Sequence, residues 1–221
     1  MNVATRVILK TSISAFAFMI SCAAHAELQG QKIYVNGGES PAAMACTTCH
    51  SANGMGTESA GFPRLAGLPQ GYLIKQLDDF RSGKRVNAVM QPIASALTDS
   101  ETRAVADYLG SLNIAVPGVD SDPTRSNANA AEKLVKQGDW SRNIPSCVAC
   151  HGMGTSGVGD SFPPLVGQPG SYIATQLDAW RSGTRKNDPN DLMGHIARSL
   201  SDSEIKDLSA YFASLSAEAK Q

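Results

Sequence analysis

The chain has 221 residues and a formal net charge of −1, with 19 Lys plus Arg against 20 Asp plus Glu. Nucleic-acid binding depends on clustered basic residues, and the sequence contains neither a basic excess nor a polybasic segment of the kind that binds anionic membranes. We therefore expect no nucleic-acid partner and at most peripheral membrane association.

Residues 1–26 are predicted to be a signal peptide. Arg6 and Lys10 precede an apolar run from about residue 13 to residue 24, and Ala24-His25-Ala26 is a small-x-small cleavage site. The apolar run is too short for a comfortable membrane span. Cleavage after Ala26 predicts a periplasmic protein. The alternatives are an uncleaved membrane anchor and lipidation at Cys22.

The rest of the chain contains an internal repeat. CTTCH at 46–50 returns as CVACH at 147–151, and FPRLAGLPQGYLIKQLDDFRSGKR at 62–85 returns as FPPLVGQPGSYIATQLDAWRSGTR at 162–185. Two homologous domains are therefore predicted, at 27–116 and 128–221. Segment 117–127 belongs to a stretch rich in Pro, Asp, Ser and Asn, and it is predicted to be a linker.

Each repeat is predicted to be helical, and the fold class is all-α. Thr98 and Ser201 are the expected N-caps of the last helix of each repeat, and Glu101 and Glu204 complete their capping boxes. Three short helices bury little apolar surface, so a large apolar cofactor is expected to fill the centre of each domain. The predicted helices are 28–35, 71–82 and 100–112 in the first repeat, and 128–137, 171–182 and 203–215 in the second.

The two C-x-x-C-H strings predict covalent haem attachment, because two thiols at this spacing can form thioethers with the vinyl groups of one haem while the next histidine binds the iron. A thioredoxin-like pair would need a strand-and-helix unit, and a zinc site would need the two pairs to converge. Disulfides would not explain a histidine after both pairs. We predict two covalently bound haem c groups. Their attachment residues are Cys46, Cys49, Cys147 and Cys150, with His50 and His151 as axial ligands.

In combination, these motifs resemble a known family. Each repeat contains CxxCH, FPxLxGxP, a Tyr-containing QLxxaRSGxR helix, a Met-containing loop and an LxDxE helix, in that order. This arrangement is similar to that of the dihaem cytochromes c4, which have tandem class I cytochrome c domains behind a signal peptide. The resemblance implies two small helical domains, each wrapped around one covalently attached haem.

Met90 and Met193 are the predicted second axial ligands. MQPIA at 90–94 corresponds to MGHIA at 193–197, so the two repeats place a methionine at the same position. Met153 follows His151 too closely for the chain to pass around a porphyrin edge. The alternative role of the paired methionines is core packing.

His195 is the competing iron donor in the second repeat. The other three of the four histidines belong to the signal peptide or to the C-x-x-C-H strings. His195 aligns with Pro92, however, and not with Met90. We therefore expect it beside the haem edge or at the surface.

The resemblance also implies supporting residues. In class I cytochromes the carbonyl of the FP proline accepts a hydrogen bond from the axial histidine, which here implies Pro63 and Pro163; the alternative is a simple turn proline. A solvated helix face is the alternative role for the repeated arginines. The other implied positions are Leu65 and Leu165 against the haem, and Tyr72, Tyr172, Arg81 and Arg181 on the propionate side.

Met/His ligation suits one-electron transfer, so we expect an electron carrier and not an enzyme. The resemblance implies a cytochrome bc complex or a dehydrogenase as donor, and a terminal oxidase or reductase as acceptor. One rival hypothesis is a dihaem enzyme of the peroxidase or thiosulfate dehydrogenase type with one labile haem face. Another is a tethered redox subunit of a membrane complex.

Overall fold

The computed structural model describes residues 28–112, 130–188 and 190–218, and its regular secondary structure in these ranges is helical. The predicted signal peptide and linker, and the predicted start of a helix at residue 128, lie outside the described residues. Within these ranges, β-type pairing is limited to isolated bridges. None of the helices in the described ranges has the length and apolar character needed to cross a membrane. The all-α prediction is confirmed.

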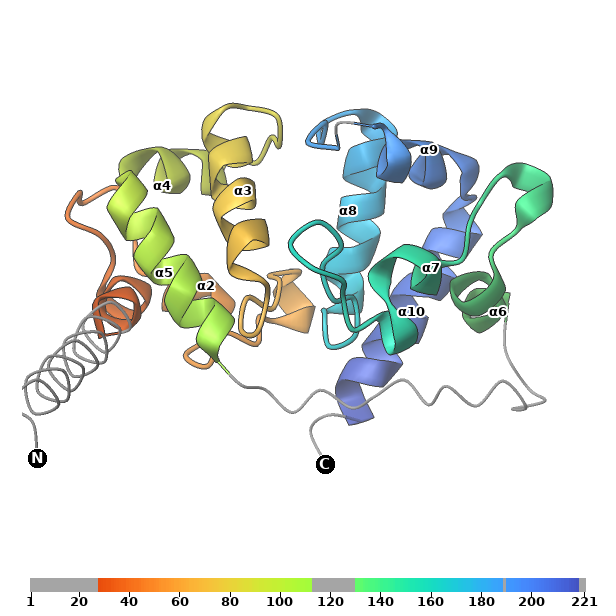
Figure 1. Ribbon diagram of the computed structural model, residues 1–221, viewed down its shortest axis with the longest axis horizontal. Coiled ribbons are helices and arrows are strands. Elements are labelled where there is room, and N and C mark those ends of the chain that lie inside the picture. The colour runs from red at the N-terminus through yellow and green to blue at the C-terminus, as the bar shows by residue number, and fades with distance from the viewer. Residues whose placement is uncertain (1–27, 113–129, 189, 219–221) are drawn as a thin grey trace, which may run out of the picture.

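The chain forms two halves that lie side by side, with α3 and α8 on their facing sides (Figure 1). The N-terminal half has a helix at 28–36, then α2 Thr47–His50, η1 Glu58–Ala60, α3 Gln70–Arg81, α4 Met90–Ala96 and α5 Asp99–Ser111. The C-terminal half has α6 Ala130–Gln137, η2 Trp140–Arg142, α7 Cys147–His151, η3 Met153–Thr155, α8 Gly170–Ser182, α9 Leu192–Ser199 and α10 Asp202–Glu218.

The last helix of each half begins with the predicted capping box. The Thr98 hydroxyl accepts a hydrogen bond from the Glu101 amide at 3.2 Å, and the Glu101 carboxylate accepts one from the Thr98 amide at 2.8 Å. Ser201 and Glu204 form the same two bonds, at 3.2 and 2.8 Å. Each pair therefore satisfies amide donors that would otherwise lack a partner at the start of the helix.

The methionine segments form short helices, so the prediction that Met90 and Met193 lie in loops is wrong. Met90 is the first residue of α4, and Met193 is the second residue of α9. Both helices are capped by a side chain upstream. Asn87 accepts from the Met90 amide at 2.9 Å, whereas the carboxylate of Asp188 accepts from the Met193 amide. Helices this short leave too few apolar positions for a periodic pattern to reveal them.

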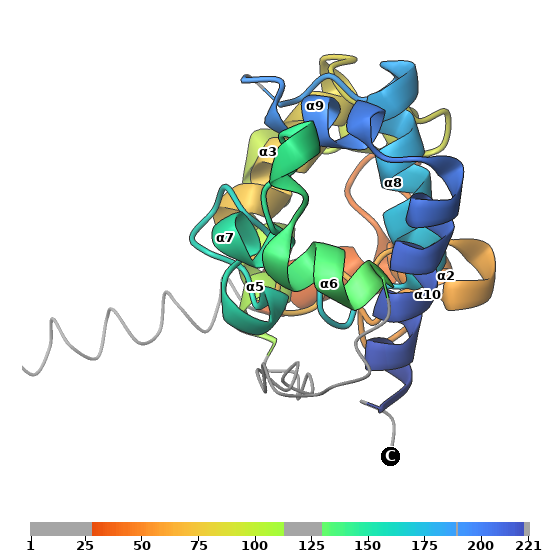
Figure 2. The same cartoon turned by 90° about the vertical axis from the view of Figure 1, so that its right-hand side faces the viewer.

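Each half has its own hydrophobic core. In the C-terminal half α6 and α8 both pack on α10, and Figure 2 shows α6 in front of this group with α9 above it. Leu134, Leu177 and Phe212 belong to this core. In the N-terminal half, Tyr34, Leu73 and Leu109 join the helix at 28–36 to α3 and α5.

Backbone bonds join the two halves at the loops after α3 and α8. The Val86 amide donates to the Thr184 carbonyl at 2.9 Å, and the Lys186 amide donates to the Lys84 carbonyl at 2.7 Å. The exchange is reciprocal, as in a short antiparallel ladder. It brings together two loops that are about 100 residues apart in the chain.

A second set of contacts joins the halves near the start of α8. The carboxylate of Glu58 accepts from the Gly170 and Ser171 amides at 2.7 and 2.8 Å, which caps α8 from the other half. Gln168 accepts from the Arg64 amide at 3.1 Å and donates to the Arg64 carbonyl at 2.9 Å. The halves are therefore docked through specific hydrogen bonds.

Candidate functional site

The two C-x-x-C-H strings form short helices that bring their thiols and histidine to one side. In the first string, the His50 amide donates to the Cys46 carbonyl at 2.9 Å, which is the helical spacing of four residues. Cys46, the residue before α2, therefore lies on the same helix face as Cys49 and His50. CVACH forms the equivalent helix α7, which ends at His151.

Both histidines are buried and each is held by a proline carbonyl. His50 Nδ1 lies 2.9 Å from the Pro63 carbonyl oxygen, and His151 Nδ1 lies 2.7 Å from that of Pro163. Because a carbonyl oxygen only accepts, Nδ1 carries the proton and Nε2 keeps its lone pair. Burial lowers the pKa of both histidines, although the bonds to the prolines act in the opposite direction. Each imidazole is thus a neutral ring with one free nitrogen donor.

One cavity of about 870 Å³ lies between the two halves and receives side chains from both repeats. Leu65, Leu165, Tyr72 and Tyr172 are on its wall, as expected from their repeated positions. His195 is exposed and is not part of the wall. Met44 is, although it has no counterpart in the second repeat. The wall includes the predicted attachment and axial residues Cys46, Cys49, His50, Met90, Cys147, Cys150, His151 and Met193.

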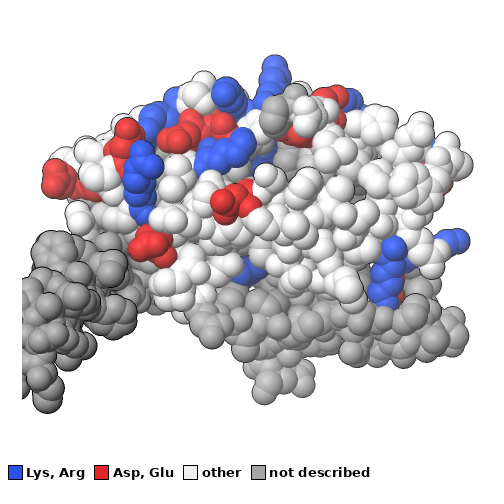
Figure 3. All heavy atoms as spheres, in the orientation of Figure 1, with Lys and Arg blue, Asp and Glu red and all other residues white. Residues whose placement is uncertain are grey.

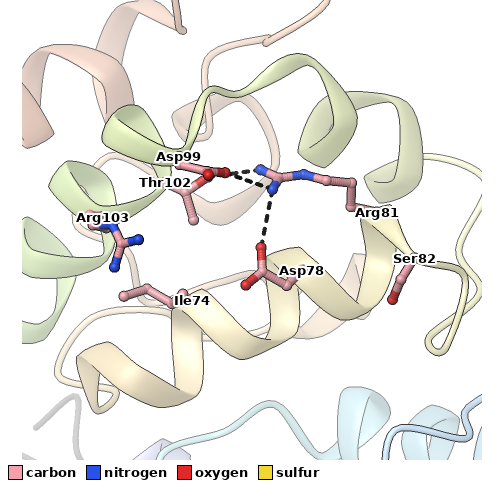
Figure 4. Close-up of a pocket in the computed structure, with 7 residues that line it drawn as sticks. All are labelled: Ile74, Asp78, Arg81, Ser82, Asp99, Thr102 and Arg103. Atoms are coloured by element: carbon pink, nitrogen blue, oxygen red, sulfur yellow. Dashed lines mark hydrogen bonds and ion pairs between the residues drawn. The ribbon is translucent and has the colours of Figure 1, made fainter.

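Arg81 and Arg181 do not reach the cavity, so the prediction that they lie on its propionate side is wrong. Figure 4 shows Arg81 turned toward Asp99 and Thr102 of α5, with Asp78 beside it. Arg81 also donates to the Leu97 carbonyl at 3.1 Å. Arg181 makes the matching bond to the Leu200 carbonyl at 2.8 Å. Both arginines hold the end of a short helix to its neighbour.

Arg85 and Arg185 occupy the cavity wall instead, at the junction of the two halves. Arg85 donates to Tyr172 at 2.7 Å and to Gln176 at 2.6 Å, both in the other half. Arg185 donates to Tyr72 at 3.4 Å and to Gln76 at 3.1 Å. The crossed bonds place two guanidinium groups next to each other. Neither arginine was predicted from the sequence, where the signal for them is the repeated second arginine of RSGKR and RSGTR.

These two cations lack an acidic partner within the described ranges. Arg85 is 7% exposed and Arg185 is 5% exposed, and no ion pair joins either of them to a described carboxylate. Burial lowers the pKa of Arg185, and the charge of Arg85 adds to this. The buried Trp180 indole N–H also has no hydrogen-bond partner among the residues that the structure describes, and the Arg185 guanidinium carbon lies 3.8 Å from the Trp180 ring centroid.

These residues fit a large planar cofactor with an acidic edge. Buried cations need an anion, and a haem has two propionate carboxylates that Arg85, Arg185 and Trp180 could hold. The apolar wall suits the porphyrin, and the neutral imidazoles suit its iron. Burial raises the pKa of Cys46 and Cys147 to about 11, so these thiols are uncharged in an apolar environment.

The competing roles of the cysteines find no support in the geometry. All four thiols are free and not paired in disulfides. In the part of the chain that the structure covers, no group of three or more His, Cys, Asp or Glu side chains is arranged to hold a metal ion. The two C-x-x-C pairs therefore do not converge on a zinc site.

Comparison with known proteins identifies the family. The cytochrome c family model matches residues 28–113 and again residues 129–216. A relative from Stutzerimonas stutzeri, named thiosulfate dehydrogenase electron acceptor, is 56% identical over 203 residues, which cover 90% of this chain and 91% of the relative.

Two solved structures show the same arrangement. Reduced recombinant cytochrome c4 from Pseudomonas stutzeri matches with a TM-score of 0.69 and 31% identity, over 85% of this chain and 97% of that chain. Thiosulfate dehydrogenase (TsdBA) from Marichromatium purpuratum matches with a TM-score of 0.74 and 41% identity over 85% of this chain. The match spans only 40% of the TsdBA chain. The present chain belongs to the cytochrome c family, as an electron-transferring dihaem cytochrome of the c4 type with two covalently bound haem c groups.

Proposed function

We propose that this protein is a periplasmic carrier that accepts single electrons from a thiosulfate-oxidising dehydrogenase and passes them to a terminal oxidase or reductase. The predicted signal peptide supports the compartment. The donor class is supported by the relative named thiosulfate dehydrogenase electron acceptor, which matches over 90% of this chain. A quinol-oxidising cytochrome bc complex is the competing donor.

In this proposal each half holds one haem through its own motif. Cys46 and Cys49 attach the first haem, with His50 and Met90 as its axial ligands. Pro63 and Pro163 hold the histidines in the tautomer that leaves Nε2 free. The corresponding residues of the second half are Cys147, Cys150, His151 and Met193.

The observation that carries the proposal is that the methionine and histidine donors of both repeats lie on the wall of one cavity. Met90 and Met193 lie in the first turn of α4 and α9, and both are on the wall that also contains the two histidines. Bound haem supplies a one-electron iron couple, and a thioether ligand raises its potential relative to a second histidine. The chain contributes two donors per site and a largely apolar wall that keeps water away.

The ligand assignment is tested by removing each methionine. Met90→Ala and Met193→Ala should each abolish half of the methionine-to-iron charge-transfer band of the ferric protein. His195→Ala should leave the band intact, because His195 is exposed and outside the cavity wall. A full band in Met193→Ala, or a high-spin ferric haem in the unmodified protein, would contradict the assignment. The high-spin result would favour the enzyme alternative.

The donor assignment is tested by stopped-flow reduction of the ferric protein. A thiosulfate dehydrogenase with thiosulfate should reduce both haems faster than a cytochrome bc complex with quinol at equal concentration. The opposite order would replace the proposed donor.

Mass spectrometry of the mature N-terminus should show cleavage after Ala26, and an intact N-terminus would favour a tethered subunit.

A further inference from the structure

We propose that Asp79 of the N-terminal half is a positioning residue for Met193 of the C-terminal half. The inference rests on the proposed function, in which Met193 is an axial ligand. The connection runs from Asp79 through Asn187 and Asp188 to the first turn of α9.

Asp79 is a buried carboxylate that holds a residue of the other half. It lies on α3 and is 5% exposed. Its Oδ2 atom accepts from the Lys75 ammonium and also from Asn187 Nδ2, the latter at 2.9 Å. The Lys75 ammonium donates in turn to the Asn187 carbonyl at 2.8 Å. Asn187 is therefore held by both its side chain and its backbone.

The remaining bonds of the Asn187 side chain also face the interface. Asn187 Nδ2 donates to Gln76 Oε1 at 2.7 Å, and Asn187 Oδ1 accepts from Arg185 Nε at 2.9 Å. The residue is 8% exposed. A buried amide that uses both N–H groups and its oxygen has one preferred position, and moving it would leave several polar groups unpaired.

Asp188, the next residue, caps the helix that contains Met193. Its carboxylate accepts from the Met193 amide and, at 3.4 Å, from the Gly194 amide. Its carbonyl accepts from the Asp191 amide at 3.1 Å. Because a single peptide bond separates Asn187 from Asp188, the contacts of Asn187 with α3 determine where this cap lies.

Among the described residues, the N-terminal half lacks the corresponding connection. Asn87 is the counterpart of Asn187, but it is exposed and caps α4 itself through the Val89 and Met90 amides at 3.0 and 2.9 Å. Lys75 and Asp79 are replaced in α8 by Thr175 and Ala179.

The longer loop of the second repeat explains this difference. The loop has three additional residues around Asp188, so its asparagine faces the interface while the aspartate becomes the cap. The backbone bonds between the two loops are reciprocal and cannot produce the asymmetry. The methionine of the C-terminal half therefore depends on docking of the N-terminal half, and Met90 has no equivalent dependence.

The experiment compares Asp79→Ala with Asp78→Ala in the full dihaem protein. Asp79→Ala installs the residue found at position 179, and Asp78→Ala removes the same charge from a side chain on α3 that is 53% exposed. Cyanide binds a ferric haem only after the methionine leaves. We expect cyanide to bind one of the two haems about tenfold faster in Asp79→Ala, because a buried charged hydrogen bond is lost, and at an unchanged rate in Asp78→Ala.

Two ligand backgrounds identify the affected haem. The faster cyanide binding caused by Asp79→Ala should persist when Met90→Ala is added and disappear when Met193→Ala is added. A double-mutant cycle gives this result when Asp79 acts through Met193. Lys75→Thr should change the rate in the same direction by a smaller factor. It provides the test if Asp79→Ala does not fold.

Three results would overturn the inference: equal rates in the Asp79 and Asp78 variants, an unchanged rate in both the Asp79 and Lys75 variants, or an effect that persists with Met193→Ala. These failures are separable from failure of the proposed function. If Met193→Ala retains the full methionine band, the axial ligation itself is wrong. If it loses half of the band and the Asp79 substitution changes nothing, only the positioning role is wrong.

Discussion

Glu101 and Glu204 occupy the same place in the two capping boxes but bind different additional partners. The Glu101 carboxylate accepts from the Glu39 amide at 2.6 Å, which ties the chain before α2 to α5. The Glu204 carboxylate instead accepts two bonds from Arg142, at 2.6 and 3.0 Å. These bonds from Arg142, helped by Ser201, lower the pKa of Glu204 to about 2.

Glu204→Gln should therefore flatten the acid dependence of stability. The folded pKa lies below the unfolded value of about 4.3, so the carboxylate stabilises the protein above that pH, and this contribution is lost as the pH falls toward about 2. We expect the variant to be about 1 kcal/mol less stable near pH 7 and equal to the unmodified protein near pH 2. Urea unfolding across this range measures the difference. Asp207→Asn, at an exposed acid of the same helix, is the control, and a gap that stays constant with pH would contradict the assignment.

At the scale of elements, the two longest described helices of each half cross at a glycine. This glycine belongs to the later helix in one half and to the earlier helix in the other. In the N-terminal half the glycine is Gly110 of α5, whereas in the C-terminal half it is Gly170 of α8. The positions opposite them are Gln70 and Ala213 respectively. The two repeats thus place the glycine of this crossing on different helices, and the approach at Gly170 is the closer of the two.

Gly170→Ala should destabilise the protein far more than Gly110→Ala. A Cβ atom at Gly170 would lie 2.1 Å from the Ser209 carbonyl oxygen, while one at Gly110 would lie 3.3 Å from the Leu68 carbonyl oxygen. We expect a cost of about 1–3 kcal/mol at Gly170 from overpacking. At Gly110, the helix propensity of alanine, worth about 1 kcal/mol, offsets the smaller displacement. Thermal unfolding of the two variants tests this order, and equal midpoints would refute it.

For the whole molecule, the docking of the halves concentrates buried cations at one interface. Arg64 is 1% exposed, and its side chain donates to the Ala66 and Val166 carbonyls at 2.6 and 3.1 Å. Burial lowers its pKa to about 10, so it stays charged near neutral pH.

The face shown in Figure 3 has most of its charged side chains over the N-terminal half, at the upper left, and few over the C-terminal half. On this face, charge is therefore distributed unevenly between the two halves.

Gln168→Leu should loosen this docking. The substitution copies Leu68 of the first repeat and leaves the Arg64 amide and carbonyl without the partners they have at 3.1 and 2.9 Å. We expect a loss of about 2 kcal/mol and a larger radius of gyration by small-angle X-ray scattering. Gln70→Leu makes the same chemical change at an exposed position and should alter neither. Unchanged scattering and stability in Gln168→Leu would show that these bonds do not hold the halves together.

Local sequence was sufficient for features that depend on neighbouring residues. The three helices predicted in each repeat, the capping boxes at Thr98 and Ser201 and the shared face of Cys46 and His50 follow from spacings of three or four residues. Alignment of one repeat with the other is likewise enough to pair Met90 with Met193. The short helices α4 and α9 were missed, because their caps come from side chains upstream and not from a periodic pattern.

By itself, the sequence determined the all-α class, the duplication and the two C-x-x-C-H centres, since these depend on residue type and short spacing. Only the tertiary structure decided which repeated arginine reaches the cavity, with Arg85 there and Arg81 bound to the neighbouring helix. It also decided that Asp79 holds Asn187, a residue 108 positions away. Helical periodicity assigns a residue to a face, but which surface that face meets depends on how the two halves dock.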